Sequence, residues 1–149
     1  MITKIKLFIN ALILENESLP TDELSIEMAS TVLLCEVMRA DGKLELQEMI
    51  QLAQIISHRF NLTQDEVELL IKEAMHTSES ATDFYTFTSK INATYAIEDK
   101  IEMVKHLWLL ALADGEVSAI EQHTIRRIAD LLHLRQSEYI QAKDIIIDQ

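Results

Sequence analysis

The chain contains very little glycine, proline or cysteine. Its 149 residues include two glycines, one proline and one cysteine. So few turn-forming residues exclude collagen-like and linker-rich chains, and they disfavour a β-sandwich of short strands joined by tight turns. One cysteine, Cys35, permits no internal disulfide, so nothing in the sequence calls for an oxidising compartment. These absences point to a protein made of helices.

Positive charge is also scarce. Thirteen Lys and Arg stand against 25 Asp and Glu, which gives a net charge of −12. This charge repels phosphate backbones and anionic surfaces, so we expect no nucleic-acid partner. With 48% apolar residues, a chain of this length can bury a substantial core. We therefore predict a single domain over residues 1–149.

No apolar run is long enough to cross a bilayer. The longest, Leu107–Ala113, falls well short of the ~18–20 residues needed. Residues 1–14 carry Lys4 and Lys6, and no signal-peptide cleavage site follows before Pro20. The apolar residues of this segment recur at helical spacing, at Ile2, Ile5, Phe8, Ile9, Leu12 and Ile13. An amphipathic helix docked on the core explains residues 1–14 best, and peripheral membrane contact is the alternative. We expect a cytoplasmic protein with no transmembrane segment.

The rest of the chain has helical periodicity throughout. It predicts an all-α fold of seven or eight helices, with Thr21 or Asp22 capping the first long helix and Thr63 to Glu66 forming a capping box. Two helices, around Met28–Met38 and Val104–Ala111, are apolar nearly all round and should be buried. The predicted core is led by Val32, Leu33, Cys35, Leu52, Leu107, Trp108, Leu110 and Ile128.

Both glycines lie in the same tripeptide, which occurs twice. Ala40-Asp41-Gly42 and Ala113-Asp114-Gly115 are 73 residues apart, and each is followed at the same distance by a glutamate, Glu48 or Glu121. Further matches downstream extend the repeat. The sequence thus predicts two related helix-loop-helix halves, at about 24–75 and 97–147.

The repeated loop has the spacing of the second half of a calcium-binding EF-hand loop. Glycine permits a turn with positive φ, and the glutamate can offer both carboxylate oxygens to a hard cation. The first and third EF-hand positions are Val37 and Arg39 in one loop and Leu110 and Leu112 in the other, so these are not EF-hands. The candidate metal ligands are Asp41, Glu48, Asp114 and Glu121. Further oxygens would come from loop carbonyls, water, Glu45, Glu116 or Ser118.

A purely structural interpretation competes with the metal site. Both glycines can end a helix in left-handed conformation, and Ser118 with Glu121 has the form of a capping box. This interpretation explains the second loop fully. It explains the first loop less well, because Glu45 is a poor N-cap residue.

Several segments carry a resemblance to a known family: Glu36–Gly42, Asp83–Thr88, Ala113–Gly115 with Glu121, and Ile125–Leu132 followed by Tyr139–Lys143. They resemble the TerB-like domains, named for tellurite-resistance protein B, and in particular the short stand-alone bacterial members. The resemblance implies an all-helical fold, a metal site built from the two acidic loops, and no established catalytic activity. The chain departs from the family pattern at Glu45, where a short Asp or Ser is usual, and at Leu46 and Ala119, where proline is common.

We therefore favour a non-enzymatic domain that binds a divalent cation and other proteins, in a tellurite or metal stress response. Ca²⁺ is the preferred ion, with Mg²⁺ and Zn²⁺ as alternatives. The protein partners are unidentified, and a homodimer is one of the open arrangements. The alternatives are a metal-dependent hydrolase that uses the same carboxylates, or a scaffold without metal. Direct capture of tellurite, an anion, is opposed by the net charge of −12.

Overall fold

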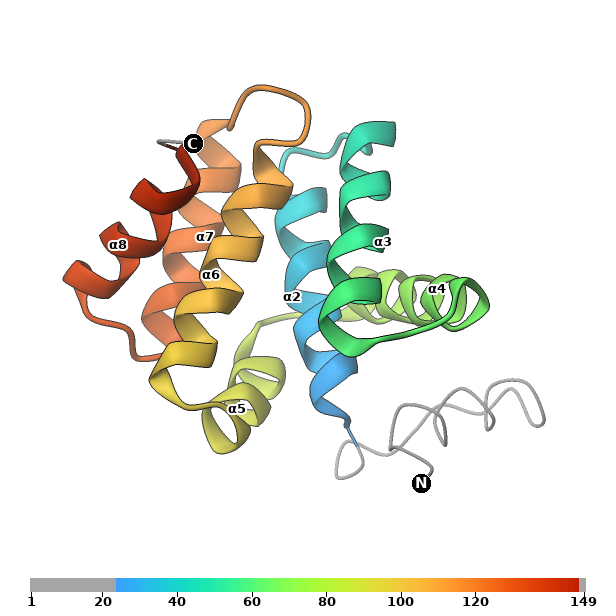
Figure 1. The fold of residues 1–149 in the computed structure, drawn as a ribbon, viewed down its shortest axis with the longest axis horizontal. Coiled ribbons are helices and arrows are strands. Elements are labelled where there is room, and N and C mark those ends of the chain that lie inside the picture. Colours follow the sequence, from blue (N-terminus) through green and yellow to red (C-terminus); the bar gives the residue numbers. More distant parts are fainter. Residues whose placement is uncertain (1–23, 148–149) are drawn as a thin grey trace.

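The computed structural model describes residues 24–147, which form seven α-helices and no strand (Figure 1). The predicted all-α class is confirmed. The expected helix in residues 1–14 lies outside the described residues. The helices are α2 (Ile26–Arg39), α3 (Leu46–Phe60), α4 (Gln64–Ser80), α5 (Tyr85–Thr94), α6 (Ile97–Ala111), α7 (Ala119–Leu131) and α8 (Gln136–Ile147).

Helix α2 is the centre of the molecule. It contacts α3, α4, α5, α6 and α7, and most of its residues are buried, as its largely apolar sequence predicts. Helix α6 lies beside α2 and contributes Trp108 and Leu107, both inaccessible to solvent. Every residue of the predicted core is buried.

The remaining helices are arranged around these two in a similar way. Helix α3 runs antiparallel to α2, and α7 runs antiparallel to α6 (Figure 1). Helix α4 then packs chiefly on α2, as α8 packs on α6. The α2–α3 and α6–α7 connections come to the same end of the molecule (Figure 1). The division into two repeat halves stays a prediction.

Local sequence signals set most helix ends. The side chain of Ser25 accepts a hydrogen bond from Met28 N at 3.0 Å, so Ser25 caps α2, and the prediction of Thr21 or Asp22 was wrong. The predicted capping box at Thr63 and Glu66 is present. Asn61 ends α3 with φ of 53°. Because a left-handed residue cannot continue a helix, the chain turns there into α4.

Among residues 24–147, no helix combines the length and apolarity that crossing a bilayer requires. The prediction of no transmembrane segment therefore holds for this part of the chain.

Candidate metal centre

The connection between α2 and α3 is a tight turn around Asp41 and Gly42. Gly42 N donates a hydrogen bond to the carbonyl of Arg39 at 3.0 Å, and Gly42 has φ of +77°. Asp41 Oδ1 accepts a hydrogen bond from Lys43 N at 3.0 Å. Because glycine has no Cβ, it takes this conformation without strain, as the sequence predicts. Within residues 24–147, the turn engages only this one carboxylate oxygen of Asp41.

The connection between α6 and α7 repeats this turn. Gly115 N donates to the carbonyl of Leu112 at 2.9 Å, and Gly115 has φ of +97°. Asp114 Oδ1 accepts from Glu116 N at 3.2 Å. Both predictions of positive φ are confirmed.

The two connections differ at the start of the next helix. Before α7, Ser118 and Glu121 form a complete capping box: Glu121 N donates to Ser118 Oγ at 3.1 Å, and Ser118 N donates to Glu121 Oε1 at 2.9 Å. Before α3, Glu45 makes no side-chain cap, and neither carboxylate oxygen of Glu48 has a hydrogen-bond partner. Capping therefore accounts for Glu121 but not for Glu48.

Glu48 is a buried carboxylate in an acidic environment. Its side chain is 1% exposed, and that of Glu121 is 2% exposed. Burial, as the largest cause, and the nearby carboxylates of Glu121, Asp114 and Asp41 together raise the pKa of Glu48 to about 8. Two ionised carboxylates cannot donate to each other. With a proton on Glu48, its contact with Glu121 becomes a hydrogen bond, which also favours the protonated form.

These interactions place the four predicted ligands around one junction between the two acidic loops. Within residues 24–147, however, no three His, Cys, Asp or Glu side chains converge as a ready-made metal site. Asp41, Asp114 and Glu121 each have one oxygen engaged by a backbone N–H. The second oxygens of these three residues and both oxygens of Glu48 remain as possible ligand atoms for a cation. This all-oxygen set fits a hard cation, provided that the side chains turn inward.

The further ligands suggested by the sequence are less well placed. Glu45 and Glu116 are exposed, and Ser118 is engaged in the cap of α7. Cys35 is fully buried, and burial raises the pKa of its thiol to about 12. It is a packed thiol rather than a nucleophile, as its apolar helix predicts.

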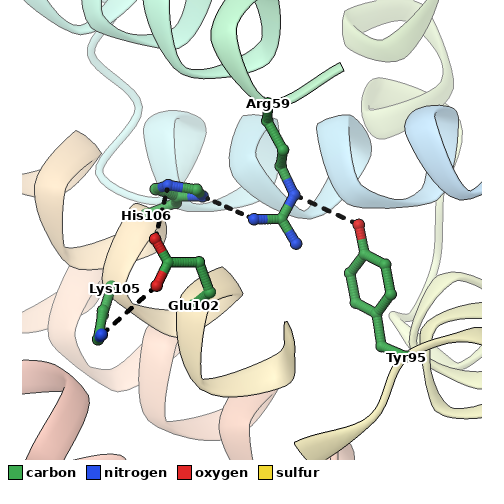
Figure 2. A network of polar contacts seen from close by, with 5 residues as sticks. All are labelled: Arg59, Tyr95, Glu102, Lys105 and His106. Atoms are coloured by element: carbon green, nitrogen blue, oxygen red, sulfur yellow. Dashed lines mark hydrogen bonds and ion pairs between the residues drawn. The ribbon is translucent and has the colours of Figure 1, made fainter. Parts of the chain in front are cut away.

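A second polar cluster, at the other end of α3, was not foreseen. Figure 2 shows Arg59 reaching from α3 to His106 of α6 and to Tyr95, which follows α5: Nη1 lies 3.2 Å from His106 Nδ1, and Nε donates to Tyr95 Oη at 3.3 Å. On its other side, His106 Nε2 lies 3.6 Å from Glu102 Oε1. Burial and the Arg59 charge lower the pKa of His106 to about 4. The neutral ring therefore accepts from Arg59 and braces α3 against α6.

Nothing in the sequence could have revealed this brace, because Arg59, Tyr95 and His106 are separated in the chain and follow no known motif. No metal-site spacing connects them. Only packing brings them together.

Comparison with known proteins bears on the whole helical region. The model of the family described as tellurite resistance protein TerB matches residues 27–144. No curated protein matches the chain, and no solved structure does either. The matched segment contains both acidic loops and five complete helices, α3 to α7. It leaves out only the first residue of α2 and the last three residues of α8. The chain belongs to the tellurite resistance protein TerB family.

Proposed function

We propose that this chain is a non-enzymatic domain that binds a divalent cation at the junction of its two acidic loops and interacts with other proteins in a tellurite or metal stress response. One observation carries the cation site: both oxygens of Glu48 are buried and have no hydrogen-bond partner. An unpartnered buried carboxylate is costly unless it is protonated or neutralised by a positive charge. Among the described residues, no Lys or Arg pairs with Glu48.

A cation would remove this cost. Asp41, Asp114 and Glu121 surround Glu48 closely enough to affect its pKa, so a divalent ion between them would offset the repulsion of all four carboxylates. Ca²⁺ is the preferred ion, since it takes six to eight oxygen ligands in flexible geometry and accepts bidentate carboxylates. Mg²⁺ is the next candidate. Zn²⁺ is less suited, because no His or Cys belongs to the set.

The expected affinity is low. Carboxylates are absent at the first and third EF-hand positions, and the side chains must turn before they bind. We therefore expect a dissociation constant of roughly 10⁻⁴ to 10⁻³ M. Binding would link the α2–α3 loop to the α6–α7 loop, and would thus stabilise the packing of two regions far apart in the sequence.

The protein-interaction part of the proposal rests on exposed aliphatic side chains beside the acidic loops. Leu44 follows Gly42, and Ile120 lies in the first turn of α7, and both are largely exposed. Apolar side chains that lie together on the surface, with charged residues around them, mark protein contacts, and the proposal takes Leu44 and Ile120 as such a pair beside the acidic junction.

A scaffold without metal is the second candidate. It is favoured by the capping role of Glu121 and by the lack of a converged ligand group among residues 24–147. In that case a proton, which Glu48 keeps near neutral pH because its pKa is raised, would take the place of the cation. The metal-dependent hydrolase remains an alternative that no observed feature favours over these two.

An NMR titration separates the candidates. The isotope-labelled chain is titrated with Ca²⁺, Mg²⁺ and Zn²⁺ to several millimolar at constant ionic strength. We expect saturable shifts at the amides of Asp41–Glu48 and Asp114–Glu121, and none in Glu48→Gln. Glu79→Gln, which removes an exposed carboxylate on α4, is the matched control and should behave like the wild type. Shifts spread evenly over the acidic surface in every variant would refute the site.

A further inference from the structure

One face of α3 carries exposed aliphatic side chains. Leu46 is 70% exposed and Ile50 is 44% exposed. Ala53 and Ser57 follow at helical spacing on the same face, so these four residues form a stripe along the length of α3. We call it the α3 stripe. The buried side of α3, with Leu52 and Ile56, is turned the other way.

The stripe leads into a groove. Between the last turns of α3 and the start of α4 lies an open depression of about 650 Å³. Its apolar floor is formed by Ala53, Leu62 and Val67, and polar side chains such as Gln54 and His58 surround it. Stripe and groove together make a continuous partly apolar surface, which no other part of residues 24–147 covers.

We propose that the chain's own residues 2–13 occupy this surface as an amphipathic helix. Their apolar residues, at Ile2, Ile5, Phe8, Ile9, Leu12 and Ile13, recur at the spacing of one helix face. Residues 2–13 and the stripe from Leu46 to Ser57 each comprise twelve residues, so both span ~18 Å as helices at a rise of about 1.5 Å per residue. The segment therefore matches the surface in length. This inference is independent of the cation site.

The path of the chain supports this placement. Helix α2 begins at the end of the molecule where α3 finishes (Figure 1). Residues 15–23 precede α2 and can reach up to ~30 Å at about 3.4 Å per residue. A helix over residues 2–13 can therefore lie parallel to α3, with its last turn near the groove and its first turn near Leu46.

Charge supports the same direction. In this orientation Lys4 and Lys6 lie at the start of α3, next to the exposed carboxylate of Glu45. The opposite orientation would carry both lysines away from this carboxylate. A bilayer is a weaker candidate for the apolar face, because the net charge of −12 opposes anionic lipid.

The first test is a double-mutant cycle in the full chain, measured by chemical unfolding. Ile9→Ser should lower the folding equilibrium constant by about tenfold, as expected for exposing a buried aliphatic side chain. Ile50→Ser should lower it too, and the double variant should lose clearly less than the product of the two single losses. Ile147→Ser is the control, because Ile147 on α8 is also 44% exposed. The double variant with Ile9→Ser and Ile147→Ser should lower the folding equilibrium constant by the product of the two single effects. Independent effects in both pairs would overturn the proposal.

The second test measures proximity directly. A nitroxide attached to Gln47→Cys should broaden the amide signals of residues 2–13, most strongly near Lys4, while the buried Cys35 stays unlabelled. A label on Asp144→Cys of α8 is the control and should leave these signals sharp. Three results would overturn the proposal: no broadening from Gln47→Cys, broadening only between labelled and isotope-labelled copies, which would indicate a second chain, or broadening lost on adding anionic phospholipid vesicles.

Discussion

The two Ala-Asp-Gly junctions have the same backbone but use their glutamates differently. In both, glycine has positive φ and the aspartate accepts a hydrogen bond from the amide two residues ahead. Glu121 then completes the cap of α7, whereas Glu48, at the corresponding position of α3, is buried without a partner. A single difference in sequence explains this: Ser118 is a good N-cap residue, and Glu45 is not.

A glutamate at this position becomes a candidate metal ligand when the helix has no cap residue to pair with it. A capping box satisfies the glutamate and the backbone at once. Without a cap partner, the side chain of Glu48 is buried near Glu121 and Asp114 of the other junction, and burial together with the nearby negative charges raises its pKa to about 8. The second junction is thus explained by helix capping, and the first requires a proton or a cation.

The largest expected effect tests whether Glu48 binds a cation. At a free Ca²⁺ concentration of 100 times the dissociation constant, the wild type should gain about 2.7 kcal/mol in free energy of unfolding. Glu48→Gln should gain far less, because a neutral amide replaces the bidentate carboxylate. Glu121→Gln should also gain less, though it can keep its cap.

Thermal melts in Ca²⁺, Mg²⁺ and chelator measure these gains at constant ionic strength. Glu79→Gln controls for the change in net charge. If all four proteins respond identically to every ion, the junction is held by helix caps alone.

The next effect concerns the turns that the two junctions share. Gly42→Ala and Gly115→Ala should each lose roughly 1–2 kcal/mol of unfolding free energy, because a Cβ strains a residue with positive φ. An added Cβ would meet no atom within 4 Å at either site, so the loss is due to the backbone alone. Gly115, with φ of +97°, should lose more than Gly42, with φ of +77°.

Chemical unfolding of both variants measures the difference. Gly42→Asn is the companion variant, since asparagine tolerates left-handed conformations, and it should be more stable than Gly42→Ala. Equal stability of both alanine variants and the wild type would contradict the role of these glycines.

A smaller effect should follow from exchanging the caps. Ser118→Ala should cost about 1 kcal/mol, because it removes the side-chain acceptor for Glu121 N. Glu45→Ser should gain up to about 1 kcal/mol, since it lets Glu48 form the capping box that α7 already has. Glu45→Ser should also weaken the response to Ca²⁺ by drawing Glu48 into the cap. Chemical unfolding in chelator measures the two stability changes, and unfolding in Ca²⁺ measures the response to the ion. If Ser118→Ala and Glu45→Ser change the free energy of unfolding in the same direction, the junctions differ for another reason.

The smallest effect separates the acidic junctions from the Arg59 brace. Because the folded-state pKa of His106 is lowered to about 4 from its ordinary 6.5, the unfolded chain binds its proton more tightly. Stability due to this group is therefore present above pH 6.5 and is lost as the pH falls toward 4. His106→Gln should flatten the stability profile in this window by less than about 1 kcal/mol, because the ring is partly accessible.

His76→Gln, at an exposed histidine of α4, should leave the profile unchanged. A profile that keeps its slope in His106→Gln would assign the pH dependence to other groups.

Particular residues show how much the sequence could predict. Helical periodicity and capping signals gave the fold class, the core around Leu33 and Trp108, and the capping box at Thr63. These features depend on neighbours three or four residues apart, which a linear pattern reveals. Helix α4 extends to Ser80, and no sharp stop signal in the sequence marks this end. Helix boundaries without a cap residue are poorly specified by local sequence.

The sequence by itself determined the all-helical fold class, the backbone turns at both glycines, and the capping box that Glu121 forms with Ser118 at the start of α7. These are local properties, fixed by residues in contact along one or two helical turns. Only the tertiary structure decided that Glu48 and Glu121 share one junction and that Arg59 contacts His106. The burial and charge that set the pKa values of Glu48 and His106 come from helices far apart in the chain. That is because desolvation and electrostatic interactions depend on distance in space rather than in sequence.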